Sequence, residues 1–169
     1  LVLLLVSMLA PIPDPLFDHP YATVLESAEG QLLGARISDD GQWRFSPTDS
    51  LPEAYIKALL IYEDKYFYQH PGINPVSIIR AIKQNWKAGK IVSGGSTITM
   101  QVDRMAMGNK PRTIGQKLLE IWLALRIELK YSKDEILMLY ANNAPFGGNV
   151  VGLSAASWRY FSRSPYNLS

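Results

Sequence analysis

The spacing of the hydrophobic positions changes near residue 46 and divides the chain into two parts. In the first part, short extended runs lie at 23–25, 32–37 and 42–45, and the turn sequences AEG and DDG separate them. This pattern predicts a small antiparallel meander. After residue 46 the hydrophobic positions follow a helical period, so the fold class is predicted to be mainly α.

Capping residues and hydrophobic spacing predict six helices after this change. They are expected at about 51–68, 75–88, 97–108, 113–131, 133–142 and 150–161. Ser50 with Glu53, and Ser132 with Glu135, form capping boxes, and Ser96 is the expected N-cap of the third helix. The fourth helix is apolar on nearly all sides, which predicts a central, buried position.

The first ten residues carry no charge, and two prolines follow within the next three positions. Ten apolar residues are too few to span a bilayer, which needs about 20. We expect residues 1–13 to be the end of a membrane anchor or signal sequence, 14–46 a linker with the short meander, and 47–169 the main domain. The alternative is that 1–10 is a buried core element. If it is an anchor of the usual orientation, the rest is extracytoplasmic.

Composition narrows the classes of function. The chain has 169 residues, 17 basic and 15 acidic side chains, a formal net charge of +2 and no cysteine. The near balance of charge excludes a polyelectrolyte, and no nucleic-acid partner is expected. The absence of cysteine excludes a disulfide scaffold, a thiolate metal site and a cysteine nucleophile. The length allows one hydrophobic core.

Glu63 is the first candidate for chemistry. On the predicted 51–68 helix it falls on the same face as the apolar residues Ile56, Leu59 and Leu60. A carboxyl group on an apolar face suits a general base or general acid. The alternative is structural, with Glu63 paired to Lys57 or Lys65 at the surface, or buried with an arginine partner.

The segment GGSTIT at 94–99 places small residues directly before a helix. Free N–H groups at a helix start favour an anion, and Thr97, Gln101 and Arg104 follow on one face. No lysine follows the glycines, which excludes a Walker loop. A phosphate-bearing ligand would suit this row, and a solvated polar stripe is the alternative.

Glu120 lies in the apolar helix with Lys117 one turn before it and Arg112 at the helix entry. These polar residues must either pair with each other or face a cavity. A structural Lys117–Glu120 pair is one interpretation. A site for a sugar–diphosphate leaving group is the other. His70 is expected to fix a turn rather than to bind metal.

Five motifs in order resemble the family 51 glycosyltransferases, the peptidoglycan-polymerising domain of class A penicillin-binding proteins. The resemblance spans 51–169, and APFGG at 144–148 and the meander are most similar to the 1C subclass. The motifs are EDKYFYQHPG at 63–72, GGSTITMQ at 94–101, Arg112 through Lys117 with Glu120, KDEIL at 133–137 with Tyr140 and Asn142, and Gly152 with Ala155, Ala156, Tyr160 and Phe161.

The resemblance implies a lysozyme-like, mainly helical glycosyltransferase fold with a membrane-embedded small lobe. It implies growth of glycan strands from lipid II, with release of undecaprenyl diphosphate and inversion at the anomeric carbon. Glu63 matches the general base, and Glu120 matches a second acid near the diphosphate that acts directly or through a divalent metal, Mg²⁺ or Mn²⁺. No organic cofactor is expected. The implied substrate-binding residues are Ser96, Thr97, Gln101, Arg104, Arg112, Lys117 and Asn142.

The resemblance also implies partners and a location. The partners are lipid II, the nascent glycan strand, the membrane and a C-terminal transpeptidase domain in the full-length protein. The location is the bacterial inner membrane, crossed once, with the catalytic domain periplasmic or extracellular. The domain is expected to be truncated at its C-terminus.

Four positions depart from the family pattern. They are Asn74 for Asp, Met100 for Gln, Gln116 for Arg and Met138 for Glu. The departures leave a second hypothesis open, a membrane-anchored module that binds lipid II without turnover. A third hypothesis is a lysozyme-like hydrolase, because two acids can also cleave glycosidic bonds.

Overall fold

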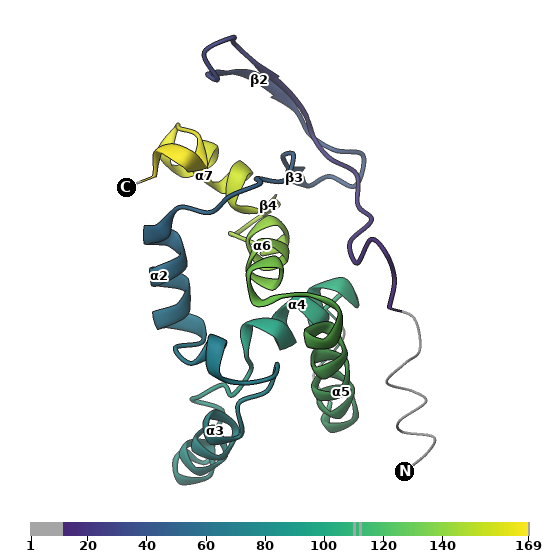
Figure 1. Cartoon of the computed structure of the whole chain (residues 1–169), viewed down its shortest axis with the longest axis vertical. Helices are drawn as coiled ribbons and strands as arrows, with labels where there is room; N and C mark the ends of the chain where they lie inside the picture. Colours follow the sequence, from purple (N-terminus) through teal and green to yellow (C-terminus); the bar gives the residue numbers. More distant parts are fainter. Residues whose placement is uncertain (1–11, 110, 112, 169) are drawn as a thin grey trace. The chain divides into compact units, whose positions relative to one another are not determined.

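The computed structural model describes residues 12–109, 111 and 113–168 (Figure 1). Most of the expected anchor segment, and the candidate residue Arg112, lie outside the described residues. The chain forms two compact units. One contains Tyr66–Lys133 with the segment before His19, and the other contains His19–Lys65 with the chain from Asp134 onward. Among the described residues, no helix has the length and apolar character needed to cross a membrane.

The first unit is built on two packed helices, α4 (Ile98–Ala106) and α5 (Ile114–Lys130). Figure 1 shows them against each other. The 3₁₀ turn η1 (Phe67–Gln69) and the helix α3 (Pro75–Ala88) precede them in the chain. The fully or nearly fully buried apolar side chains of this unit are Phe67, Ile98, Met100, Val102, Ala124 and Ile127.

The second unit contains the strands and the remaining helices. β1 (Thr23–Glu26) and β2 (Leu32–Arg36) form an antiparallel hairpin, and β3 (Trp43–Arg44) pairs in parallel with β4 (Val150–Val151). The helices are α2 (Glu53–Glu63), α6 (Lys133–Asn143), which starts at the unit boundary, α7 (Leu153–Phe161) and the 3₁₀ turn η2 (Pro165–Asn167). Trp43, Phe45 and Phe146 pack against the buried cluster of Val150, Ala155 and Ala156.

The predicted fold class is confirmed. The structure is mainly helical with a small N-terminal hairpin, which is consistent with the lysozyme-like fold that the resemblance implies. The predicted three-stranded meander was wrong for its third strand. Trp43 and Arg44 leave the hairpin and pair with β4, because this pairing brings Trp43 onto the apolar cluster of β4 and α7.

Several predicted helix details were also wrong. No side-chain hydrogen bond caps α2, whose N-cap is Pro52, and the helix ends at Glu63 rather than near residue 68. The N-cap of α4 is Thr97, whose hydroxyl accepts from the Met100 N–H, and not Ser96. The helix α5 is not buried on all sides, since Leu118 and Leu129 are 63% and 72% exposed. The last helix starts three residues later than predicted because Val150–Val151 forms β4.

Candidate active site

Glu63 is the last residue of α2 and is half-buried. Two phenols of the same unit lie within its electrostatic range. Burial raises the pKa of Tyr55, and the charges of Tyr140 and Glu63 raise it further. Burial and the charge of Glu63 together raise the pKa of Tyr140 to about 12. Both hydroxyls therefore stay protonated at neutral pH, and the carboxylate has neutral groups beside it.

The structural alternative for Glu63 named Lys57 as a partner. In the structure, Lys57 pairs instead with Glu53, one turn earlier on α2, at 2.6 Å, and both side chains are exposed. This exposed pair lies on the same helix as Glu63 and makes Glu53 a natural control position.

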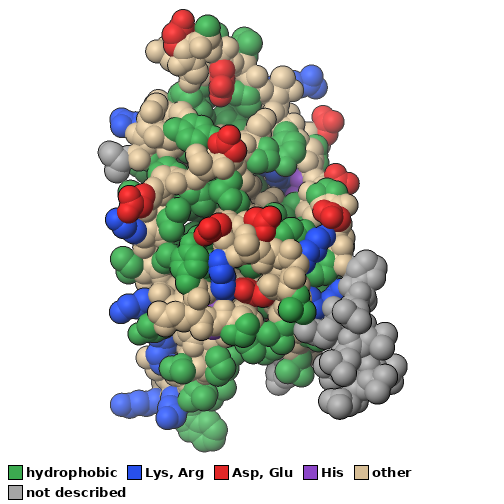
Figure 2. Space-filling model, viewed as in Figure 1, with side chains coloured by type: hydrophobic (Ala, Val, Ile, Leu, Met, Phe, Trp, Pro, Cys, Tyr) green, Lys and Arg blue, Asp and Glu red, His purple; other side chains and the backbone are tan. Residues whose placement is uncertain are grey.

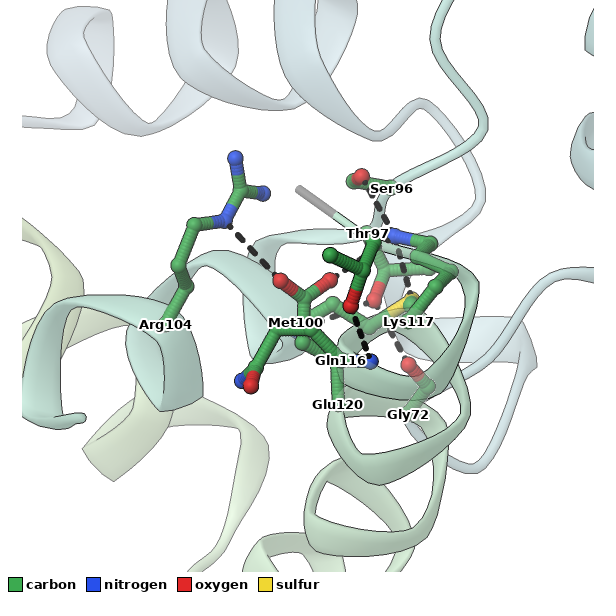
Figure 3. A network of polar contacts seen from close by, with 9 residues as sticks. Gly72, Ser96, Thr97, Met100, Arg104, Gln116, Lys117 and Glu120 are labelled. Carbon is green, nitrogen blue, oxygen red and sulfur yellow. Dashed lines mark hydrogen bonds and ion pairs between the residues drawn. The ribbon is translucent and has the colours of Figure 1, made fainter. Parts of the chain in front are cut away.

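Glu120 is 3% exposed and lies between two cations (Figure 3). Lys117 Nζ donates to Glu120 Oε2 at 3.0 Å, and Arg104 Nε lies 3.4 Å from Glu120 Oε1. The side chain of Lys117 is 38% exposed and that of Arg104 is 15% exposed. The predicted pairing of Lys117 with Glu120 is present, and Arg104 of α4 joins it. Two cations around one buried acid leave positive charge for an anionic ligand.

Lys117 also reaches the glycine-rich segment before α4. Its Nζ donates to Ser96 Oγ at 2.8 Å (Figure 3). Gly95 fixes the path of this segment, because a Cβ there would lie 2.9 Å from Ile78 Cα of α3. Ser96, Lys117, Glu120 and Arg104 thus form one connected cluster in the first unit, the acid–cation cluster.

The turn after η1 supports the start of α4. Thr97 Oγ1 donates to the Gly72 carbonyl at 2.6 Å, and Thr97 is 1% exposed. Gly72 has φ +83°, and a Cβ there would lie 2.8 Å from the Ala124 carbonyl oxygen of α5. Only glycine fits this position without a shift of backbone. The turn is therefore wedged between α4 and α5.

A second set of polar contacts holds the same turn. Lys133 Nζ donates to the His70 carbonyl at 2.7 Å and to Glu128 Oε1 at 2.8 Å, and Thr99 Oγ1 donates to the same Glu128 oxygen at 2.6 Å. Glu128 is therefore a structural residue that links α4 to the start of α6. His70 contributes to the turn through its backbone, in line with the expected role of fixing this turn.

Asp103 is an acid of this region that the sequence analysis did not single out. It is 2% exposed, and its Oδ2 has no hydrogen-bond partner among the described residues. Burial, and then the charge of Glu120, raise the pKa of Asp103 to about 7, although Arg104 and Lys117 act in the opposite direction. The spacing of Asp103 from Thr99 and Met100, four and three residues along α4, is the signal that could have placed it on the buried face.

The remaining candidates have different surroundings. Gln101 is half-buried on α4. Asn142 exchanges two hydrogen bonds with the backbone of Thr48, accepting from its N–H at 3.0 Å and donating to its carbonyl at 3.1 Å. Both ends of the Asn142 amide are thus engaged within the second unit. The roles of Gln101, Asn142 and Arg112 in substrate binding stay predictions.

Two of the four departures have a structural explanation. Met100 is fully buried, with its Sδ 4.0 Å from Lys117 Nζ, so it packs beneath the cluster. Asn74 is the N-cap of α3 and accepts from the Ser77 N–H at 3.0 Å. Asn and Asp are about equally good N-caps, so this substitution keeps the contact. Gln116 and Met138 are half-buried, and nothing in the structure explains them.

The surroundings of Glu120 do not fit a divalent cation. Lys117 and Arg104 already contact its two oxygens, and a metal would have to displace both. The described part of the chain contains no group of three Asp, Glu, His or Cys side chains placed to hold a metal ion. A site for Mg²⁺ or Mn²⁺ normally offers several oxygen ligands.

Comparison with known proteins identifies the family. A family model described as Transglycosylase matches residues 29–169, from the hairpin through η2. The chain belongs to the transglycosylase family. The match includes β2 as well as the helical part, so this family domain extends beyond the span that the motifs cover.

Curated relatives of this transglycosylase domain are penicillin-binding proteins. Penicillin-binding protein 1C of Escherichia coli K12 is 45% identical over 158 residues, which are 93% of this chain and 20% of the relative. Penicillin-binding protein 1A of Aquifex aeolicus is 36% identical over 173 aligned residues, with 100% of this chain and 24% of the relative covered. Penicillin-binding protein 1B of Vibrio cholerae is 40% identical over 80% of this chain and 18% of the relative. The chain thus spans about a fifth to a quarter of these relatives.

Proposed function

We propose that the chain is a peptidoglycan glycosyltransferase domain that polymerises lipid II into glycan strands. The observation that carries the proposal is the acid–cation cluster, in which a 3% exposed Glu120 sits between Lys117 and Arg104. Such a cluster suits a leaving group that develops negative charge on a diphosphate. Membership of the transglycosylase family gives the reaction class.

In the proposed step Glu63 is the general base. Its carboxylate removes the proton from the 4-hydroxyl of the acceptor GlcNAc. The freed oxygen forms a bond to C1 of the donor MurNAc, and the bond from C1 to the diphosphate oxygen breaks. Attack from the face opposite the leaving group inverts the anomeric carbon. Undecaprenyl diphosphate leaves with the electron pair.

The surroundings of each acid support this division of roles. Glu63 is half-buried and lies beside the phenols of Tyr55 and Tyr140, which stay protonated at neutral pH. Glu120 orients Lys117 and Arg104, whose positive charges face the departing diphosphate. Ser96, held by Lys117, adds a hydroxyl at the start of α4.

The binding-module hypothesis, without turnover, rested on the four departures. Met100 packs in the core and Asn74 still caps α3, so neither removes a group from the cluster. Both acids and Lys117 are present. An active transferase is therefore the better explanation of the site.

The proposal extends to the setting of the enzyme. We place it at the bacterial inner membrane, with a single anchor and the catalytic domain on the outer side, because a polyprenyl-linked substrate is confined to the membrane. The names of the relatives, and the fraction of their length that this chain spans, support a transpeptidase domain after it in the full-length protein.

Two substrates distinguish the candidate functions. The protein is incubated in detergent with lipid II and, separately, with polymerised glycan. A glycosyltransferase lengthens products from lipid II and leaves the polymer intact. A hydrolase shortens the polymer and ignores lipid II. A protein that binds lipid II but changes neither substrate would contradict the proposal and favour the binding module.

A further inference from the structure

Asp103 is a buried acid that the proposed reaction does not use. It lies on the buried side of α4, the helix that packs on α5, and is 2% exposed. Figure 2 shows other acidic side chains at the surface of the molecule, where water solvates their charge. Among the acids that the structure describes, Asp103 alone has a buried carboxyl oxygen, Oδ2, without a hydrogen-bond partner. Because a buried carboxylate without partners is costly, this environment suits the neutral acid.

Two other acids of the same unit show how buried carboxylates are normally held. Lys117 and Arg104 contact the two oxygens of Glu120, and Glu128 Oε1 accepts from Lys133 and Thr99. In the described part of the chain, by contrast, no ion pair involves Asp103. The fold thus supplies partners for the charged form of Glu120 and Glu128 and leaves Oδ2 of Asp103 without one.

Asp103 and the acid–cation cluster act on each other through their charges. Burial opposes the ionisation of Asp103 most strongly, and the charge of Glu120 on α5 opposes it further. Arg104, the next residue of α4, and Lys117 of α5 favour ionisation. The charged groups around Asp103 are therefore the three charged members of the cluster, and the state of Asp103 changes the field in which they lie.

The protonation of Asp103 decides the charge that the cluster offers to a ligand. Arg104, Lys117 and Glu120 are two cations and one anion, which leave one positive charge. An ionised Asp103 would cancel it. Arg104 Nε lies 3.4 Å from Glu120 Oε1 and makes no hydrogen bond to a described residue, so charge rather than a hydrogen bond holds it there. An additional buried carboxylate would compete with a bound anion for this guanidinium.

We propose that Asp103 controls the charge of the acid–cation cluster, and that the cluster binds the diphosphate of the glycosyl donor more tightly while Asp103 is protonated. The inference rests on the proposed function, because it takes the diphosphate of lipid II as the ligand. In this role Asp103 does not touch the ligand. It is a positioning residue that acts through Arg104 and Lys117. By linkage, binding of the diphosphate makes Asp103 hold its proton more tightly, so binding takes up protons at alkaline pH.

The test measures binding of a lipid II analogue to the 169-residue protein in detergent. The analogue is methylated at the GlcNAc 4-hydroxyl, so it keeps the diphosphate but cannot act as the acceptor, and binding is measured without polymerisation. Its diphosphate is esterified at both ends and does not titrate near neutral pH. We expect the Kd to be about 5- to 10-fold higher at pH 8 than at pH 6, because a group with a pKa of about 7 is only about a tenth protonated at pH 8.

Calorimetry in two buffers of different ionisation enthalpy gives the proton uptake. The wild type should take up part of a proton for each ligand bound at pH 8. Asp103→Asn resembles the neutral acid, so it should bind equally well at both pH values and take up no proton. Asp18→Asn, at an exposed acid of the same unit, is the matched control and should keep the wild-type pH dependence. Equal affinity of the wild type at both pH values, or a pH dependence that persists in Asp103→Asn, would overturn the proposal.

Polymerisation of unmodified lipid II, measured on the same samples, separates this proposal from the proposed function. Binding that does not depend on pH, together with polymerisation, would overturn charge control by Asp103 and leave the glycosyltransferase in place. Binding that depends on pH through Asp103, without polymerisation at either pH, would do the reverse. A protein that binds the analogue at neither pH would overturn charge control, whatever its polymerisation.

Discussion

Glu63 and Glu120 are the two acids of the proposed reaction, one in each compact unit, and different groups surround them. Glu63 ends a helix, is half-buried and lies near two protonated phenols. Glu120 lies inside its unit with Lys117 and Arg104 on its two oxygens. Cations on both oxygens of Glu120 offer positive charge for a departing anion, whereas the phenols near Glu63 stay protonated at neutral pH. This difference agrees with the proposed roles, proton transfer by Glu63 and charge stabilisation by the cluster around Glu120.

Among changes that leave both acids in place, removing a cation from the cluster should have the largest effect. Lys117→Met keeps the length of the side chain but removes its charge, so we expect kcat/KM for lipid II to fall by about 10² to 10³. Steady-state polymerisation measures the loss. Lys57→Met, on the helix of Glu63, is the control and should keep the wild-type rate. If Lys117→Met and Lys57→Met polymerised lipid II at equal rates, the cations around Glu120 would have no special role in the reaction.

The turn that supports α4 can be disturbed without touching either acid. Gly72→Ala forces a side chain into a φ of +83° and against the Ala124 carbonyl. We expect a loss of about 3 kcal/mol in the free energy of unfolding, measured by urea denaturation.

Gly89→Ala is the matched control for this turn. Gly89 has φ +63°, but a Cβ there has nothing within 4 Å, so the expected loss is only about 1 kcal/mol. A loss at Gly89 as large as that at Gly72 would show that close packing at the turn is unimportant.

The raised pKa of Asp103, which lies in the unit of Glu120, predicts that the free energy of unfolding depends on pH. Its pKa is about 7 in the folded protein, against the ordinary value of 3.8 for an aspartate, so the folded state holds the proton more tightly. The associated stability is fully present below pH 4 and is lost as the pH rises to about 7. Asp103→Asn removes this dependence and should be more stable than the wild type by up to about 4 kcal/mol at pH 8, since a shift of about three pKa units corresponds to that free energy. The check is the difference between the two unfolding curves across pH 4 to 8. Parallel curves would contradict the burial of a neutral acid.

The smallest effect is expected at the cap of α3. Asn74→Ala removes the acceptor of the Ser77 N–H and should cost about 1 kcal/mol of unfolding free energy. Asn74→Asp should change it by only a few tenths of that amount. If Asp were as damaging as Ala in thermal unfolding, the departure at this position would not be a conservative one.

The helices and most residues of the acid–cation cluster could be predicted from the sequence because they depend on local spacing. The apolar period located the six helices, and Glu120, Lys117 and Arg104 stood out as polar residues on apolar faces or at a helix start. The pairing of β3 with β4 was not accessible, since Trp43 and Val150 are far apart in the chain and meet only in the fold.

Burial explains the other differences. Asp103 was not singled out from the sequence, because the packing of α4 on α5 is what buries it. Ser96 resembled a helix cap, but its hydroxyl accepts from Lys117 while Thr97 takes the cap. The motifs therefore located the segments that form the acid–cation cluster, and the tertiary contacts decided which side chains meet there.

The most direct test of the central claim compares Glu63→Gln with Glu53→Gln, two changes on one helix. Lipid II binding and lipid II polymerisation are measured separately for each variant. Glu63→Gln should bind lipid II within about twofold of the wild type and lose polymerisation, because the missing group acts as a base and not as a ligand. Glu53→Gln should keep both properties. Polymerisation retained by Glu63→Gln would contradict the account.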